Sequence, residues 1–401
     1  MEIKMDIISE LNGKRILIWG YGREGKATEH FLQRCVKPAS VDIFEGKKEE
    51  IDEDDYDFII KSPGIVMNEE NPKYTSETEL FLQQFRDQVI GITGTKGKST
   101  TSAMLYTVLK ACSGRPVLLL GNIGQPCLDY FEEVTEDTII VYEMSCHQLA
   151  HTNVSPHIAI FLNLYEEHLD YYGTVEKYFE AKSHIAAYQK SGDYFFVGEN
   201  VPQIDTKAQR TVLHQPKGVH YDLKLAGEHN QYDAQFVERV AELLGCEKEA
   251  VLKSMADFEG LPHRLQYVGT YRGVRYYDDS ISTIPEAAIN AAMSIPDAKT
   301  VLIGGMDRGI NYDLLVTFIR KHKEFQFICA YASGKRIFGE VGDCENCVYA
   351  EDLEQAVEAA VQMTEPGGAC ILSPAAASYG YFKNFEERGE TFQKYVHAFA
   401  Q

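Results

Sequence analysis

Basic residues are scarce in this sequence. Lysine and arginine together number 39, against 60 aspartate and glutamate residues, and the formal net charge is −21. Such an excess of negative charge argues against broad electrostatic binding to nucleic acid or to an anionic membrane. An anionic substrate would have to be held by local basic groups or by backbone N–H groups.

Long apolar segments are absent as well. No run approaches the ~18 apolar residues of a membrane-spanning helix. The first six residues, Met-Glu-Ile-Lys-Met-Asp, lack the apolar core of a secretion signal. We therefore expect a cytoplasmic protein with neither a membrane nor a nucleic acid as its partner.

Cysteines are few and irregularly placed. The nine of them are scattered and odd in number, which suits a reducing compartment. Cys344 and Cys347 form a lone CxxC without a second pair. A loop carrying two thiols is the favoured interpretation there, over a zinc or redox site.

The length and the pattern of the chain predict several α/β domains. A chain of 401 residues corresponds to roughly two or three domains. Apolar strand patterns alternate with helical ones throughout, which indicates mainly parallel sheets. We expect a Rossmann-like domain over residues 1–91, a central P-loop ATPase-like parallel sheet over 92–260, and a Rossmann-like C-terminal domain over 261–401.

The segment Gly91–Thr100 is the most informative part of the chain. Gln88–Ile90 precedes it as a short apolar strand, and Thr101–Lys110 follows as an amphipathic helix. Glycines at 91, 94 and 97 allow the backbone to turn its N–H groups inward at a helix N-terminus. This arrangement predicts a cradle for a polyphosphate.

Two side chains complete the predicted phosphate loop. Lys98 adds a positive charge, and the Ser99 hydroxyl is placed to reach Mg²⁺. The common pattern GxxxxGK[ST] would need glycine at position 92, where this chain has Ile92. The loop is therefore a variant of that pattern.

A second glycine motif lies near the N-terminus. Gly20, Gly22 and Gly25 follow the apolar strand that begins at Arg15, and Glu45 ends the next strand. This GxGxxG pattern suits NAD or FAD, with Glu45 as the ribose acceptor, but the same chemistry serves a UDP group. The motif alone leaves these ligands open.

Three further residues of the central section are candidates for chemistry. Glu143 follows an apolar strand beside the phosphate loop, which suits a Mg²⁺ ligand. His168 lies past the next apolar strand and suits a metal ligand or a donor to a phosphoryl oxygen. Lys182 lies within a predicted helix, and composition alone makes it a solvated helix lysine.

The third section supplies further polar groups. Arg264 is suited to contact phosphates, and Asp279 is suited to accept from ribose hydroxyls. The segments Ser373–Ser378 and Lys383–Gly389 together suit a small carboxylate.

These segments, taken in order, resemble the Mur ligase family from about Lys14 to Phe399. The segments that carry the resemblance are Thr93–Ser99, Gly121–Pro126, Glu143–Leu149, His168–Asp170, Gly227–Asn230, Leu261–Arg264, Asp279–Ser280, Leu372–Ala375 and Phe382–Gly389. The resemblance implies an ATP-dependent ligase that adds D-glutamate to UDP-N-acetylmuramoyl-L-alanine in peptidoglycan synthesis, with L-glutamate as the alternative amino acid. It also implies that the first domain binds UDP rather than a dinucleotide, and we expect a monomer.

The resemblance assigns roles to matching positions. The implied catalytic residues are Lys98, His168 and Lys182. The implied ATP-binding residues are Gly94, Thr95, Lys96, Gly97, Lys98, Ser99, Thr100, Asn122, Asn230, Arg264 and Asp279. Those for the UDP substrate are Gly22, Arg23, Glu24, Gly25, Glu45, Ser62, Pro63 and Gly64. Those for the amino acid are Thr283, Arg308, Ser378, Tyr379 and Phe385. Two Mg²⁺ sites are implied, one at Ser99 and Glu143 and one at His168 and a carbamylated Lys182.

Three positions depart from the family's usual pattern. Ile281 replaces a lysine expected to help bind the glutamate carboxylate, and an aliphatic side chain cannot pair with a carboxylate. Arg308 stands where lysine is usual, which preserves the charge. Asp233 stands where asparagine is common. We therefore expect intact ATP chemistry and a weaker or altered amino-acid site.

Two functions from other classes compete with this interpretation. A nucleotide-binding regulatory protein without ligase activity would not need Lys98, Glu143, His168 and Lys182 all to be present. A dehydrogenase would use the GxGxxG motif but would leave the phosphate loop unexplained.

Overall fold

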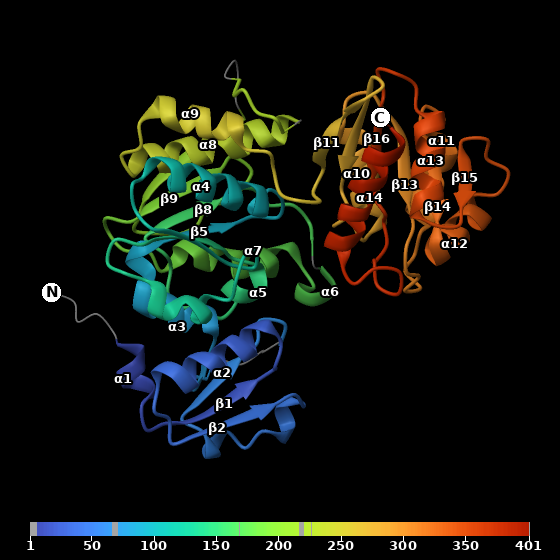
Figure 1. The fold of residues 1–401 in the computed structure, drawn as a ribbon. Coiled ribbons are helices and arrows are strands. Elements are labelled where there is room, and N and C mark those ends of the chain that lie inside the picture. Colours follow the sequence, from blue (N-terminus) through green and yellow to red (C-terminus); the bar gives the residue numbers. More distant parts are fainter. Residues whose placement is uncertain (1–5, 66–70, 168, 216–219, 226, 401) are drawn as a thin grey trace. The chain divides into compact units, whose positions relative to one another are not determined.

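The computed structural model describes residues 6–65, 71–167, 169–215, 220–225 and 227–400 (Figure 1). The chain divides into two compact units. The first comprises Met1–Asp222 and His229–Ala256, and the second comprises Leu223–Glu228 and Asp257–Gln401.

The first unit contains two sheets in which every paired strand is parallel. The smaller sheet has the order β2-β1-β3-β4, and the larger one has the order β10-β9-β8-β5-β7-β6. The strands of the smaller sheet are β1 Arg15–Trp19, β2 Ser40–Phe44, β3 Phe58–Lys61 and β4 Tyr74–Thr75. Those of the larger are β5 Val89–Thr93, β6 Val117–Gly121, β7 Ile139–Glu143, β8 Ile158–Phe161, β9 Tyr194–Gly198 and β10 Gln209–Leu213.

Helices cover the larger sheet on both faces, with α4 and α8 on one side and α5 and α7 on the other (Figure 1). The α-helices on this part of the chain are α1 Ile7–Leu11, α2 Arg23–Cys35, α3 Glu77–Phe85, α4 Lys98–Cys112, α5 Cys146–Leu149, α6 Leu169–Tyr172, α7 Val175–Ala187, α8 Glu228–Leu243 and α9 Lys248–Asp257. Strand β5, for example, is buried at all five positions, as a parallel strand covered on two faces must be.

The second unit contains one six-stranded sheet of order β11-β12-β16-β13-β14-β15. Its pairs are parallel except for the hairpin of β11 and β12. The strands are β11 Gln266–Tyr271, β12 Val274–Asp278, β13 Ala298–Ile303, β14 Gln326–Ala330, β15 Cys347–Ala350 and β16 Ala369–Leu372. The helices are α10 Pro285–Ser294, α11 Asp313–Lys321, α12 Tyr331–Val341, α13 Leu353–Met363 and α14 Phe385–Phe399.

The predicted α/β class with parallel sheets is confirmed, but some element boundaries were wrong. The strand before the phosphate loop continues to Thr93 instead of ending at Ile90, because its ladder with β8 runs as far as Phe161. The following helix begins at Lys98 rather than Thr101. Between residues 192 and 221 the structure contains the two short strands β9 and β10.

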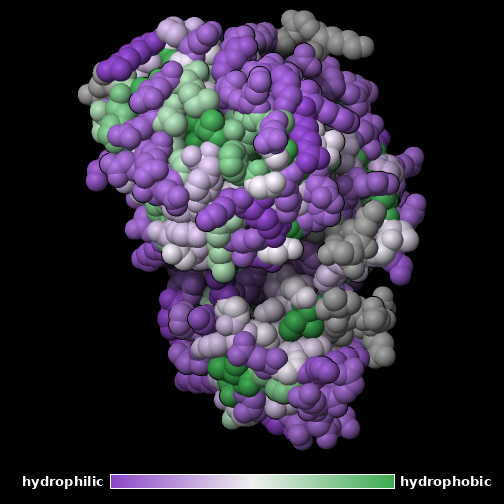
Figure 2. Space-filling model, turned by 90° about the vertical axis from the view of Figure 1, so that its right-hand side faces the viewer, coloured by the Kyte–Doolittle hydropathy of each residue, from purple (hydrophilic) through white to green (hydrophobic). Residues whose placement is uncertain are grey.

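No helix among the described residues is both long enough and apolar enough to cross a membrane. Hydrophilic residues predominate on the face drawn in Figure 2, where hydrophobic residues form small separate patches.

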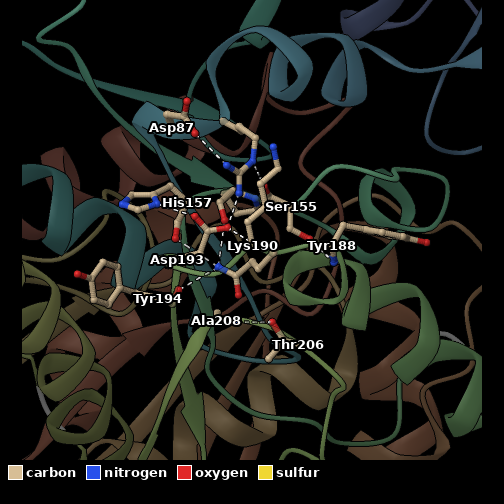
Figure 3. A network of polar contacts seen from close by, with 12 residues as sticks. Asp87, Ser155, His157, Tyr188, Lys190, Asp193, Tyr194, Thr206 and Ala208 are labelled. Carbon is tan, nitrogen blue, oxygen red and sulfur yellow. Dashed lines mark hydrogen bonds and ion pairs between the residues drawn. The ribbon is translucent and has the colours of Figure 1, made fainter. Parts of the chain in front are cut away.

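A buried polar network fastens the amino ends of three neighbouring strands of the larger sheet (Figure 3). Asp193, just before β9, accepts hydrogen bonds from the His157 Nδ1 atom at 2.7 Å and from the Lys190 backbone N–H at 2.6 Å, and it pairs with the Arg86 guanidinium. The Arg86 Nε–H also donates to the Ser155 carbonyl at 2.9 Å. The network lies at the edge of the sheet opposite the phosphate loop, since that loop follows the carboxyl end of β5.

We expect Asp193→Asn to lower the free energy of unfolding by about 1–3 kcal/mol. The neutral amide loses the ion pair with Arg86 and leaves one buried hydrogen-bond donor without an acceptor. Asp87→Asn is the matched control, because Asp87 also pairs with Arg86 but is 69% exposed. Its expected cost is below about 0.5 kcal/mol. Denaturant titration of both variants checks this, and equal losses would contradict it.

The same network gives a pH dependence. Burial raises the pKa of Asp193, but the hydrogen bonds from His157 and Lys190 and the charge of Arg86 outweigh it and hold the pKa below the usual 3.8. The stabilisation that the ionised Asp193 carboxylate provides is therefore complete above about pH 3.8. It is lost as the pH falls through the lower pKa that the carboxyl has in the folded state. The Asp193→Asn variant should lack this part of the acid unfolding.

Candidate functional site

The phosphate loop connects β5 to α4 with its backbone tightly constrained. Gly97 caps the helix with φ at +83°, a conformation that favours glycine. The Lys98 Nζ atom donates to the carbonyls of Gly94 at 3.0 Å and Thr95 at 3.1 Å. Burial lowers the pKa of Lys98, and the charge of Glu143 opposes that shift. The lysine is thus held along its own loop at the start of the helix.

Lys182 is not the solvated lysine that composition suggested. It is only 1% exposed on α7, and its Nζ atom donates to the Gly94 carbonyl at 2.9 Å and lies 4.9 Å from the centre of the Tyr178 ring. Burial, and then the charge of Lys98, lower its pKa to about 7. A large fraction of this amine is therefore neutral, and nucleophilic, near pH 7.

Glu143 ends β7 with its side chain fully buried. The Asn122 Nδ2 atom donates to its Oε1 atom at 2.6 Å. The other oxygen, Oε2, is buried without a hydrogen-bond partner among the described residues. A buried carboxylate oxygen without a partner is costly unless a cation is bound, so Glu143 fits the role of a Mg²⁺ ligand.

The second predicted metal site consists of His168 and Lys182. His168 lies outside the described residues. Within the described ranges, no three His, Cys, Asp or Glu side chains converge in a way that could hold a metal ion.

A cavity of about 350 Å³ joins the two predicted parts of the first unit's site. Its lining includes three residues predicted for the UDP substrate and three predicted for ATP chemistry. These are Glu24, Pro63, Gly64, Lys98, Asn122 and Lys182. Segments far apart in sequence therefore open onto one space beside the phosphate loop.

The remaining residues predicted for the UDP substrate lie in the N-terminal glycine motif or just after β2 and β3. Gly22 caps α2, which begins at Arg23, and the Arg23 guanidinium donates to the Gly124 carbonyl at 2.8 Å. The Ser62 hydroxyl donates to the Gly20 carbonyl at 2.9 Å. Glu45 lies exposed just after β2 and is absent from the lining of the cavity.

Gln148 is a cavity residue that sequence reasoning missed. Its Nε2 atom donates to the Glu24 Oε1 atom at 2.8 Å, and its Oε1 atom accepts from the Ser145 N–H at 2.8 Å. Burial, opposed by this hydrogen bond, raises the pKa of Glu24 to about 6. The Ser145–Gln148 spacing is a capping box, so the sequence contained the signal for the helix start but not for the contact with Glu24.

Asp233, on α8, lies directly beneath the phosphate loop. A Cβ atom on Gly97 would lie 2.6 Å from its Oδ2 atom, so only glycine fits between them. Burial raises the pKa of Asp233 well above its usual value, and a hydrogen bond with Thr101 opposes the shift only in part. Burial of this carboxyl group beneath the loop therefore favours its protonated form more than water does. Asn230, one turn earlier on α8, is also buried.

We expect Asp233→Asn to stabilise the protein increasingly as the pH rises. An acid whose pKa is raised by folding loses stability above its unfolded pKa of about 3.8, and the amide has no proton to lose. The gain in Tm should widen between about pH 5 and pH 8, reaching about 2–8 °C. Thermal unfolding across this range checks the prediction. Asp257→Asn, at an exposed position, should show no such trend, and a pH-independent difference for Asp233→Asn would contradict it.

In the second unit, Arg264 lies on a strained loop and is exposed. Its neighbours His263 and Leu265 have φ of +60° and +43°, in the left-handed region. The loop is fastened by the His263 Nδ1 atom, 2.7 Å from the Asp278 Oδ2 atom, and by the Leu265 N–H, which donates to Asp279 at 3.1 Å.

Asp279 is buried where β12 ends. The Ser373 hydroxyl donates to it at 2.7 Å, and burial raises its pKa to about 6 against the hydrogen bonds from Ser282 and Ser373. Its partners Leu265, Ser282 and Ser373 all belong to its own unit.

The predicted amino-acid residues occupy loops of the second unit. The Arg308 guanidinium approaches the Thr283 carbonyl at 3.5 Å, Ser378 is buried, and Tyr379 is 61% exposed. Phe385 begins α14, and its carbonyl accepts from the Ser280 hydroxyl at 2.7 Å.

The buried Arg388 joins these loops; the sequence analysis included it in the segment Lys383–Gly389 without a role of its own. It donates to the Ser280 hydroxyl at 2.9 Å, to the Ser280 carbonyl at 2.7 Å and to the Ala376 carbonyl at 3.0 Å. Arg388 lies in the first turn of α14 among charged residues, so the sequence there gives no sign that its side chain is buried.

Comparison with known proteins identifies the family. Residues 92–242 match the Mur ligase middle domain. The chain is 32% identical to the UDP-N-acetylmuramoylalanine--D-glutamate ligase of Geobacillus kaustophilus, over 98% of this chain and 94% of that one. The chain belongs to the Mur ligase family.

Other Mur ligases agree with this assignment in sequence and fold. The enzyme of the same name from Aquifex aeolicus is 29% identical, over 95% of this chain and 98% of that one. Two solved structures from Thermotoga maritima share the fold. MurC has a TM-score of 0.60 at 18% identity, covering 96% of this Mur ligase and 99% of MurC, and MurF in complex with ADP has 0.59 at 16%, covering 97% and 96%.

Proposed function

We propose that this Mur ligase adds D-glutamate to UDP-N-acetylmuramoyl-L-alanine with consumption of ATP, as part of peptidoglycan synthesis. The observation that carries the proposal is the shared lining of one cavity. Glu24 and Gly64, both predicted for the UDP substrate, line it together with residues predicted for ATP chemistry, which are Lys98 and Lys182. The relatives are D-glutamate ligases by name, which favours that enantiomer over L-glutamate.

The proposed reaction has two steps. A carboxylate oxygen of the UDP substrate attacks the γ-phosphorus of ATP, ADP leaves, and an acyl phosphate forms. The glutamate amino group then attacks the acyl carbon, and inorganic phosphate leaves from the tetrahedral intermediate as the amide bond forms. Lys98 and the N–H groups at the start of α4 are suited to stabilise the charge on the transferring phosphoryl group.

The proposed enzyme also uses Mg²⁺ and a carbamate group on Lys182. Ser99 and Glu143 would hold one Mg²⁺, and His168 and Lys182 a second. The metal supplies charge neutralisation on the phosphate oxygens. The neutral amine of Lys182 can take up carbon dioxide as a carbamate, which supplies an anionic oxygen beside Lys98.

The remaining assignments belong to the same proposal. Residues 1–91 would bind the UDP moiety, residues 92–260 the ATP phosphates, and residues 261–401 glutamate and the adenosine part of ATP. We propose that the enzyme acts in the cytoplasm, as a monomer.

Product analysis tests the reaction and its amino acid together. Purified protein is incubated with UDP-N-acetylmuramoyl-L-alanine, ATP and Mg²⁺ and with D- or L-glutamate in separate reactions, and the uridine product is weighed by mass spectrometry. We expect the D-glutamyl adduct. A product only with L-glutamate would favour the alternative amino acid, and no product with either would contradict the proposal.

We expect Ile281→Lys to lower the KM for glutamate by about tenfold, because a cation replaces an aliphatic group at the predicted carboxylate site. The KM for ATP should stay within about twofold, since charge screening limits more distant effects. Ile281→Met is the control for side-chain length without charge. Steady-state kinetics with each substrate varied in turn check this, and equal KM values for glutamate in all three proteins would contradict it.

A further inference from the structure

The CxxC segment is the sequence motif that the ligase function leaves unexplained. It forms a turn just before β15, in which the Cys347 N–H donates to the Cys344 carbonyl at 3.1 Å. Residues that close such a turn have Cα atoms within about 7 Å of each other. A disulfide spans about 4.4–6.8 Å between Cα atoms, so the backbone spacing of Cys344 and Cys347 is compatible with one.

The turn is held by Asn346, one of the two residues between the cysteines. The buried Asn346 side chain donates from Nδ2 to three backbone carbonyls around the end of α11, those of Ile319 at 3.1 Å, His322 at 3.2 Å and Phe325 at 3.1 Å. Such an anchor keeps the segment in the turn conformation in the reduced protein. The ordering that closing a disulfide requires is therefore already present.

A cation lies beside the more accessible thiol. The Lys323 Nζ atom lies 2.7 Å from the Cys344 sulfur and 2.9 Å from the Asn346 Oδ1 atom. The ammonium group is thus in contact with the sulfur, where it can stabilise negative charge that develops on it during attack on an oxidant. Cys344 is partly exposed, so a small oxidant in solution can reach it.

A third thiol supports Cys347 from inside the sheet. The buried Cys329 sulfur lies 3.4 Å from the Cys347 sulfur. Its hydrogen bond, together with the charge of Lys323, holds the pKa of Cys347 below the usual value against burial. Strand register pairs Cys329 with Tyr349, two residues beyond Cys347. This offset is about 6.6 Å along the strand. Combined with the spacing between the strands, it separates the Cα atoms of Cys329 and Cys347 by more than a disulfide usually spans.

A metal site is the other use of clustered cysteines. Across the described ranges, no three His, Cys, Asp or Glu side chains are arranged to hold a metal ion, and these three cysteines are no exception. The geometry therefore favours redox chemistry between two thiols over zinc binding.

We propose that Cys344 and Cys347 form a peroxide-reactive dithiol, a modification site for hydrogen peroxide and small organic hydroperoxides. The Cys344 thiolate attacks the peroxide O–O bond, giving a sulfenic acid and releasing water or an alcohol after protonation. The Cys347 thiolate then attacks the Cys344 sulfur and expels hydroxide, which leaves as water. With hydrogen peroxide, two thiols and one peroxide become one disulfide and two waters.

The dithiol is separate from the ligase chemistry. It precedes β15 at the amino end of the parallel strands, whereas Asp279, Ser373 and the loop to Arg308 follow the carboxyl ends of β12, β16 and β13. These are opposite edges of the sheet. Oxidation should therefore leave ligase kinetics within about twofold, because no part of the reacting site is displaced.

The test measures covalent state on the full chain, so it does not depend on ligase activity. Reduced protein is treated with hydrogen peroxide, quenched with N-ethylmaleimide and digested for peptide mass spectrometry. We expect a Cys344–Cys347 disulfide to form before any other cysteine is oxidised. Cys344→Ser should abolish it, and Lys323→Met should slow it by about tenfold because the thiolate loses its cation. Cys112→Ser, which removes another partly exposed thiol, should leave the rate unchanged.

Three results would overturn the proposal. One is oxidation of Cys112 as fast as that of Cys344. Another is a Cys329–Cys347 disulfide as the main product. The last is an unchanged rate in Lys323→Met whose melting temperature matches that of the parent protein.

Discussion

Replacing Lys98 by methionine lowers kcat/KM for the ligase reaction by about 10²–10³-fold, which is the usual cost of removing one preorganised donor from a charge-stabilising site. Lys98 lies at the first position of α4 and lines the cavity that also holds Glu24 and Lys182. Among the described residues, the bonds of its Nζ atom go to two loop carbonyls and to no carboxylate, so it can turn to a phosphate without breaking an ion pair there. Steady-state phosphate release measures the effect.

Lys96→Met is the matched control for Lys98→Met. Lys96 lies on the same loop, but its side chain is 64% exposed and pairs with Glu167 at 2.8 Å. The resemblance counts Lys96 among the ATP-binding residues, but its exposed side chain pairs with Glu167 and is absent from the lining of the cavity, so we expect activity to change by less than about twofold. Equal losses in the two variants would mean that the loop carries positive charge without a specific role for Lys98. Melting temperatures of both variants exclude unfolding as the cause.

Removing Lys182 has the second large effect. We expect Lys182→Met to lower kcat by at least about 10²-fold, because the proposed anionic oxygen of the carbamate disappears. Lys182→Glu should retain more activity than Lys182→Met, since it returns a carboxylate to the same cavity. Lys177→Met, at an exposed position of the same helix, should resemble the parent enzyme. Lys182→Glu no more active than Lys182→Met would contradict the carbamate.

The carbamate also predicts a dependence on pH and carbon dioxide. Only the neutral amine reacts with carbon dioxide, and burial lowers the pKa of Lys182 to about 7. The carbamate should therefore be depleted as the pH falls below that value and in buffers freed of carbon dioxide. Added bicarbonate should restore activity, and ¹³C-labelled bicarbonate should give a carbamate NMR signal that Lys182→Met lacks. A carbon dioxide-independent enzyme would contradict this account.

The sequence allowed good prediction wherever the signal was local. The phosphate loop was identified because the glycines, Lys98 and the following helix are contiguous, and only its boundaries needed correction. Glu143 was expected after a strand and proves to be its last residue, which leaves its carboxylate at the same edge of the sheet.

Burial of polar residues was the part that the sequence could not reveal. Lys182 and Arg388 occupy helices whose composition suits solvent, and both become buried because carbonyl groups from distant segments surround them. The contact between Gln148 and Glu24 depends on how two segments 124 residues apart meet. Such contacts depend on tertiary packing, which has no short-range pattern in the sequence.

The transfer of oxygen from substrate to phosphate tests the central claim most directly. UDP-N-acetylmuramoyl-L-alanine labelled with ¹⁸O in its carboxylate is converted with ATP, Mg²⁺ and D-glutamate, and the inorganic phosphate is analysed by mass spectrometry. If the cavity beside Lys98 activates the carboxylate as an acyl phosphate, the released phosphate carries one ¹⁸O atom. Phosphate without ¹⁸O, released while the amide product forms, would contradict this mechanism.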